Sequence, residues 1–197
     1  MNYRCPHLRS WGKGSLAGLA LLLSFFYSFQ NLSAQHQVIG LGTRWNDSFR
    51  EWIVQTENED VNGTLELRWA FRDEWTEWDF RLGDTIASIQ QKWKDDPGLW
   101  EVRSLGVTVT ARSTWPGNFR SWRLTSGNYS ITWQSRYANI LEEWELRDDR
   151  LGNFEVHTYY ERDPRDWVVV DELDPDVPFA MRLAMIFIAV YHSTPKQ

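Results

Sequence analysis

The stretch that decides the fold of this chain runs Asp171-Glu-Leu-Asp-Pro-Asp-Val-Pro178 and continues as Phe179-Ala-Met-Arg-Leu-Ala-Met-Ile-Phe-Ile-Ala-Val-Tyr191. Its second part is apolar on every side and is interrupted only by Arg182. A helix that is apolar all round must be enclosed by protein or by lipid. The run falls short of the roughly 20 residues that span a bilayer, so we expect a helix over residues 177–192 in the core of a domain.

The loop before this segment predicts how the helix begins. Either Asp174 or Asp176 can cap the helix N-terminus, and the prolines of the loop suit a first helical turn. The guanidinium of Arg182 cannot stay unpaired in an apolar interior. We therefore expect it to reach the mouth of the surrounding structure or to meet an acid such as Asp171 or Asp174.

The region before the loop, roughly residues 49–170, predicts short β-strands punctuated by tryptophan. In residues 121–134 two alternating segments flank Ser-Gly-Asn, which is a hairpin signature. The same form recurs in residues 100–111 and 144–159, and residues 64–71 also alternate. Aromatic residues make up 15% of the chain and favour half-buried, pleated surfaces.

These segments amount to about ten to twelve short strands at a spacing of roughly 8–12 residues, which is typical of a sandwich or a barrel. Together with the apolar helix they predict a mainly β fold, a closed or nearly closed antiparallel barrel around a buried C-terminal helix. The hairpins share a period only loosely, so neither a propeller nor a solenoid is predicted. We expect one domain over residues 35–197.

The first 34 residues have the pattern of a signal peptide. Arg4, Arg9 and Lys13 form a basic start without acids, an apolar segment covers residues 16–29, and Ala34 supplies a small residue for cleavage. The alternative is an uncleaved anchor, for which the apolar run is short. We expect cleavage after Ala34 and export to a periplasmic or extracellular location.

The expected mature chain has no cysteine, so packing rather than disulfides must stabilise it. It keeps 18 Lys and Arg against 27 Asp and Glu, a net charge of about −9. Such a charge disfavours nucleic acid and anionic lipid headgroups as partners and also serves solubility. We expect a monomer without a transmembrane span in the mature chain, and a protein, glycan or lipid partner.

The C-terminal residues carry a resemblance to a known family. The segment Asp163-Pro-Arg-Asp-Trp-Val-Val-Val-Asp-Glu-Leu173 leads through the proline loop into the apolar run, and residues 86–93 are followed by Trp100-Glu-Val102. Over residues 45–193 this order resembles the tubby C-terminal-like barrel of the LURP-one-related and scramblase proteins, which implies a barrel closed around its last helix. Tubby-type domains hold phosphoinositide in a basic pocket. No Lys/Arg cluster here matches that pocket, Arg120 and Arg123 being interleaved with strand positions.

Motifs of catalysis are missing from the sequence. It contains no Gly-x-Ser-x-Gly elbow, metal-spaced histidine pair or phosphate loop. His36 and His192 lie near the ends of the mature chain, and we expect a structural or surface role for His157. The acids of residues 163–176 lack the spacing of a calcium loop. We predict no catalytic residue, no metal and no cofactor. A secreted carboxylate hydrolase is a less favoured alternative, its acids drawn from Glu142, Glu143 and Asp148.

Tryptophan is the most suggestive residue type for binding. Trp75, Trp78 and Trp115 lie at or near predicted turns, where exposed rings stack on flat apolar faces, whereas most others are expected to fill the core. We therefore predict these three as ligand-binding residues of a non-enzymatic exported module. The alternative is a lipocalin-like carrier of a small hydrophobic ligand, suggested by size, export and Gly42-Thr-Arg-Trp45.

Overall fold

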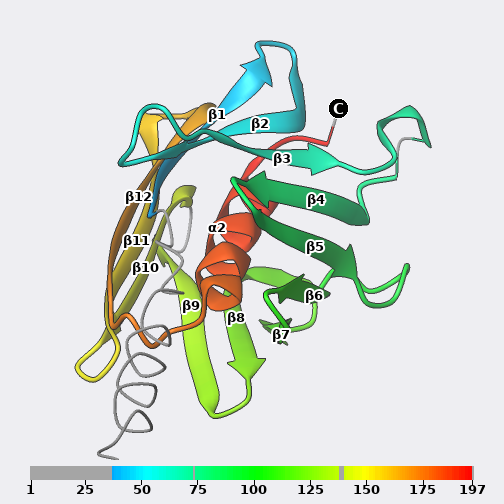
Figure 1. Ribbon diagram of the computed structural model, residues 1–197. Helices are drawn as coiled ribbons and strands as arrows, with labels where there is room; N and C mark the ends of the chain where they lie inside the picture. The colour runs from blue at the N-terminus through cyan, green and yellow to red at the C-terminus, as the bar shows by residue number, and fades with distance from the viewer. Residues whose placement is uncertain (1–36, 73, 138–139, 197) are drawn as a thin grey trace, which may run out of the picture. The chain divides into compact units, whose positions relative to one another are not determined.

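The computed structural model describes residues 37–72, 74–137 and 140–196. The predicted signal peptide lies outside these residues. Within them the chain forms a closed barrel of twelve antiparallel strands in a simple meander, each strand pairing with the next in sequence, and β12 pairs with β1 to close the ring (Figure 1). The first six strands are β1 (Val38–Trp45), β2 (Ser48–Thr56), β3 (Gly63–Leu67), β4 (Glu77–Leu82), β5 (Thr85–Gln91) and β6 (Leu99–Ser104). The other six are β7 (Val107–Trp115), β8 (Asn118–Ser126), β9 (Tyr129–Tyr137), β10 (Ile140–Asp148), β11 (Gly152–Tyr160) and β12 (Asp163–Leu173).

Alternation of buried and exposed side chains explains why these segments pair as they do. In β8 the inward Trp122 and Leu124 are buried, whereas Arg123 between them is exposed. Trp122 faces Trp133 of β9 across the sheet, and Leu124 faces Ile131. A slip of one residue would turn all of these side chains to the wrong face. The three predicted hairpins are confirmed, whereas the predicted strand over residues 64–71 ends at Leu67 and a short 3₁₀ helix, η1 (Ala70–Arg72), follows.

The helix α2 (Phe179–Ser193) fills the barrel, as the sequence predicts (Figure 1). From Phe179 to Val190 every residue except Arg182 is buried. Each large apolar side chain removed from water contributes about 1.5–3 kcal/mol. Strands and helix therefore share one core, and neither covers its apolar surface without the other.

The helix begins differently from the expectation. Pro178 is the N-cap, with an extended backbone and no side-chain capping bond, so the prediction of an aspartate cap is wrong. Asp174 instead accepts the backbone N–H of Asp176 at 2.8 Å, which tightens the loop. Arg182 meets Asp171 as expected, Nε to Oδ2 at 2.7 Å, and also donates to the carbonyl groups of Leu173, Asp174 and Val177.

The seam between the first and last strands is short. Only three residue pairs join β1 to β12, namely Gly40 with Val168, Leu41 with Trp167 and Gly42 with Asp166. A Cβ atom on Gly40 would lie 2.7 Å from the Trp167 carbonyl oxygen, so the close approach of the two strands requires glycine there. The barrel is thus closed through a glycine-lined contact.

Candidate aromatic rim

Every even-numbered strand contains a buried tryptophan, in its first half or at its centre. We call Trp52, Trp78, Trp100, Trp122, Trp144 and Trp167 the girdle tryptophans, and each is at most 2% exposed. Each indole Nε1 donates to the backbone carbonyl three residues earlier, at 2.8–3.3 Å. A buried indole N–H needs such a partner, and the bond fixes the entry of each strand into the barrel.

An exposed aromatic residue precedes each girdle tryptophan by seven residues. These rim aromatics are Trp45 (56% exposed), Phe71 (78%), Trp93 (63%), Trp115 (66%), Tyr137 (46%) and Tyr160 (60%). Each lies at the end of an odd-numbered strand or in the connection that follows it. In a closed meander all connections from odd to even strands lie at the same end, so the six rings surround one end of the barrel.

This arrangement reveals a repeat that is closer than the sequence analysis recognised. Trp78, Trp100, Trp122 and Trp144 are each 22 residues apart, and so are Phe71, Trp93, Trp115 and Tyr137. One repeat corresponds to an even strand and the odd strand after it. The signal that could have found the rim is an aromatic residue seven positions before a tryptophan, which occurs six times at nearly constant intervals.

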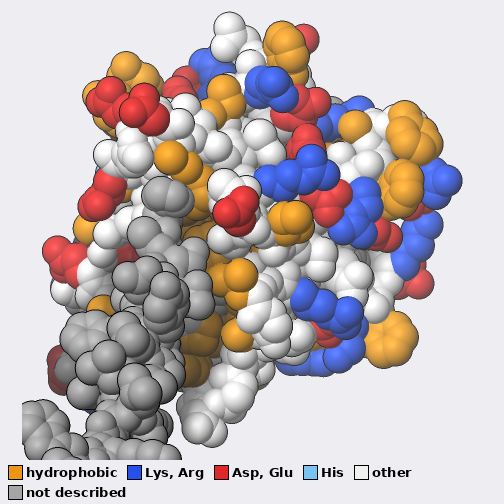
Figure 2. Space-filling model, viewed as in Figure 1, with side chains coloured by type: hydrophobic (Ala, Val, Ile, Leu, Met, Phe, Trp, Pro, Cys, Tyr) orange, Lys and Arg blue, Asp and Glu red, His pale blue; other side chains and the backbone are white. Residues whose placement is uncertain are grey.

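Charge is distributed unevenly between the two ends. Among the described residues outside α2 and the strands, the connections at the rim end and the residues after α2 contain six Lys or Arg and five Asp or Glu. The connections at the opposite end contain one Arg and seven Asp or Glu. On the face shown in Figure 2, Lys and Arg gather on the right, interspersed with Asp, Glu and hydrophobic side chains, whereas the charged side chains at the left edge are mainly Asp and Glu.

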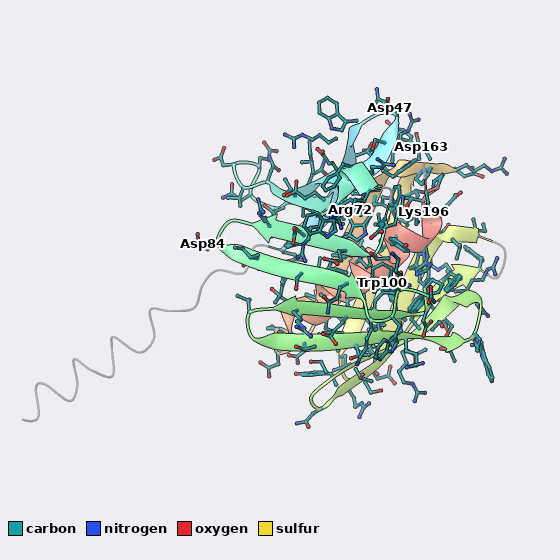
Figure 3. The ribbon with its side chains drawn as sticks, turned by 90° about the vertical axis from the view of Figure 1, so that its right-hand side faces the viewer. Asp47, Arg72, Asp84, Trp100, Asp163 and Lys196 are labelled. Atoms are coloured by element: carbon teal, nitrogen blue, oxygen red, sulfur yellow. The ribbon has the colours of Figure 1, made fainter. Side chains whose placement is uncertain are left out.

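The C-terminal end of α2 fills the mouth of the barrel at the rim end. The Nζ of Lys196 lies 3.9 Å from the ring centroid of Tyr191 and 5.7 Å from that of Trp75. It donates to the carbonyl groups of Tyr191 and Thr194, which offsets the negative end of the helix dipole. Figure 3 shows Lys196 and Asp163 at the end of the molecule away from Asp84, which lies in an acidic connection.

His192 is packed between aromatic rings at the same mouth. Its ring stacks on Phe119 at 4.6 Å and lies 4.8 Å from Trp122. Its Nε2 is buried without a hydrogen-bond partner among the described residues. Burial, together with the nearby charge of Lys196, lowers the pKa of His192 to about 3, so the ring is neutral at physiological pH.

The three predicted ligand-binding tryptophans occupy three different environments. Trp115 is an exposed rim aromatic, as expected for a contact residue. Trp75 is half-buried and lies near two cations, with the guanidinium carbon of Arg50 5.5 Å from its ring centroid. Trp78 is 2% exposed and packs on Phe187 and Tyr191 of α2, so the expectation that it is exposed is wrong. It lies inside because it starts a strand rather than a turn.

A hollow of about 370 Å³ opens on the outer wall beside the seam. Tyr159 and Tyr160 form one side of it, with their rings 4.7 Å apart. Its lining comprises Ile39, Leu41, Gln55, Tyr159, Tyr160, Asp166, Trp167 and Val168. Since Tyr160 belongs to both features, the hollow is continuous with the rim.

The structure does not bring the candidate hydrolase acids together as a pair. Glu142 accepts the backbone N–H of Arg162, and Glu143 pairs with Arg136 at 3.3 Å. Asp148 accepts two backbone N–H groups in the turn after β10, and these bonds lower the pKa of its carboxyl. Glu143 and Asp148 stand five residues apart on one strand, about 17 Å at strand geometry, beyond the separation of glycosidase carboxylates.

The described residues that could bind a metal or act as catalytic histidines do not come together either. Over residues 37–72, 74–137 and 140–196, no three His, Cys, Asp or Glu side chains gather as metal ligands would. His157 lies half-buried on β11, its Nδ1 3.1 Å from the Thr158 carbonyl oxygen. His36 lies outside the described residues. None of the helices in the described part of the chain is long and apolar enough to cross a membrane.

Comparison of the chain with protein-family models, with curated proteins and with solved structures finds no match.

Proposed function

We propose that this protein is an exported, non-enzymatic binding module that engages its partner through the rim aromatics. The observation that carries the proposal is the recurrence of an exposed aromatic side chain at one position of the repeat, six times, at one end of the barrel. Exposed aromatic rings stabilise a fold little where they lie, and clustered ones mark interaction sites. Core packing explains the girdle tryptophans but gives no reason for the rim.

The barrel interior offers less support for a function of its own. A lipocalin-like carrier requires space inside the barrel, and α2 with the girdle tryptophans occupies that space. The hollow at the seam is therefore the better place for a small ligand, and it lies on the outer wall. A ligand there would also touch Tyr160, so both features serve one surface.

The proposal is tested by capture of partners from the native envelope. The bait is the wild-type protein, the triple variant Trp45→Ala/Trp93→Ala/Trp115→Ala, or Leu105→Asn as a matched control. Leu105 is 66% exposed at the opposite end of the barrel. We expect material retained by wild type and by Leu105→Asn to be lost with the triple variant. Equal retention by all three, with equal melting temperatures, would exclude the rim as the binding surface.

A further inference from the structure

We infer that the partner of the rim is the surface of a lipid bilayer, on which the barrel stands end-on. This inference rests on the proposed function and names the class of its partner. The rim rings enter the interfacial layer of the membrane, the acidic end stays in water, and none of the helices among the described residues crosses it.

The shape of the rim end favours a broad object over a small ligand. The six rings are distributed around the whole circumference, one at each connection from an odd to an even strand. The centre of this end is filled by Lys196, Tyr191 and Trp75, which are held together by contacts between cation and ring. A ligand able to touch all six rings at once must therefore extend across the mouth.

The residue types of the rim match the chemistry of a membrane interface. Five of the six are Trp or Tyr, which combine an apolar ring with a polar N–H or O–H group. Such residues concentrate at the headgroup level of membranes, where the ring contacts lipid and the polar group contacts water. A glycan site instead needs its stacking rings beside groups that bind hydroxyls.

The distribution of charge decides which end of the barrel faces the membrane. The expected mature chain is acidic and would be repelled by anionic headgroups if its charge were uniform. The acidic connections, however, lie at the end opposite to the rim. Near the rim, the side chains of Lys94 and Arg162 are 74% and 84% exposed. Their ion pairs with Glu74 and Glu161 lie at the surface, where such pairs are weak and can exchange a carboxylate for a phosphate.

The test uses the exported product of the full chain and two kinds of vesicle, phosphatidylcholine alone and phosphatidylcholine with a third of phosphatidylglycerol. We expect co-sedimentation with both, stronger on the anionic vesicles at low salt and retained on phosphatidylcholine at high salt, because ring insertion is not screened. Each replacement of a rim tryptophan by alanine removes about 50 Å² of inserted ring from the membrane. It should therefore lower the vesicle partition coefficient about tenfold. Leu105→Asn should bind as wild type does.

A second readout locates the contact. Lipids brominated near the headgroup should quench the tryptophan emission of wild type. The quenched fraction should fall strongly in Trp45→Ala/Trp93→Ala/Trp115→Ala, since the girdle indoles are buried and only the half-buried Trp69 and Trp75 remain near this end. Vesicle binding that survives in the triple variant would overturn the inference, because a retained leader or another surface would then carry it.

The inference and the proposed function can fail separately. If no vesicle binds, while capture from the native envelope still depends on the rim, the partner is a protein or a glycan and only the lipid inference is overturned. If neither vesicles nor envelope material depends on the rim, both are wrong.

Discussion

Leu105 and Trp115 flank opposite ends of strand β7, and each leaves 66% of its surface exposed. One belongs to the connection between β6 and β7, the other to the rim. Leu105 also has a φ of 50°, a backbone conformation that asparagine tolerates better than leucine. The pair therefore provides two equally exposed apolar residues, of which one has a proposed function.

Trp115→Ala is expected to leave stability nearly unchanged and to weaken binding. An exposed ring contributes little to folding, so the free energy of unfolding should change by about 0.5 kcal/mol or less in urea titrations. Partner capture or vesicle binding should fall. Leu105→Asn should neither destabilise the protein nor weaken binding. A loss of about 3–5 kcal/mol in the unfolding free energy of Trp115→Ala would show that this residue is part of the core.

Trp100 and Trp93 give the corresponding comparison for the core. Trp100 is fully buried, lies 4.6 Å from Tyr191 and 4.9 Å from Phe187, and donates to the Pro97 carbonyl at 3.0 Å. Trp100→Ala should cost about 3–5 kcal/mol of unfolding free energy. Trp93→Ala, seven residues earlier, should cost about 0.5 kcal/mol or less. Chemical denaturation followed by circular dichroism measures both, and similar losses would refute the division into rim and girdle.

Arg182 should be far more important for stability than a surface arginine. Its side chain is 13% exposed and that of Asp171 is 9% exposed, and the guanidinium also satisfies three carbonyl groups. Arg182→Ala leaves a buried carboxylate unpaired and should cost about 3–5 kcal/mol.

Replacing both partners separates pairing from packing. The double variant Asp171→Leu/Arg182→Met removes both charges and should recover part of the loss, as measured by thermal unfolding. A double variant less stable than Arg182→Ala would mean that the loop carbonyl groups, rather than the ion pair, depend on the arginine.

His192 should make the protein less stable in mild acid. Its pKa is about 3 in the folded state and about 6.5 when unfolded, so between these values the unfolded chain binds the extra proton. The stabilisation is complete above pH 6.5 and is lost as pH falls toward 3, by about 1.4 kcal/mol for each pH unit at most.

His192→Phe tests this assignment. Phenylalanine keeps the stack on Phe119 and removes the buried, unpaired Nε2. Unfolding free energies between pH 4 and 6.5 should therefore vary less with pH than in wild type. That range lies above the titration of Asp148 and Asp163, whose carboxyl pKa values are lowered by hydrogen bonds. An unchanged slope would assign the acid sensitivity to other groups.

Local patterns were sufficient to predict the fold. Alternation in residues 121–134, turn residues between strands and an apolar run with a single arginine specify hairpins and a buried helix, because each depends on neighbours in sequence. The ion pair of Arg182 was predictable for the same reason, since a buried guanidinium must have a partner.

The rim was harder to predict because it is a property of the closed ring. Trp115 and Tyr137 belong to one surface only once the meander places alternate connections at the same end. Trp78 shows the converse error. Its place in Trp-Thr-Glu-Trp suggested a turn, but strand β4 begins at Glu77 and turns the ring inward. The immediate neighbours of a tryptophan do not distinguish one that opens a strand from one that closes it, and only the recurrence along the whole chain does.

The order of elements along the chain has a consequence for how a protein of this design matures. The helix that fills the barrel follows all twelve strands in sequence, and the seam joins Gly40 to Val168. During synthesis or translocation, the hairpins can form one by one, but their tryptophan-rich inner faces stay uncovered until residues 179–193 emerge. A chain interrupted before that point exposes the apolar face of its sheet and an unpaired edge strand. We therefore expect chaperones and proteases to bind it. Burial of the core thus waits until residues 179–193 have emerged, after all twelve strands.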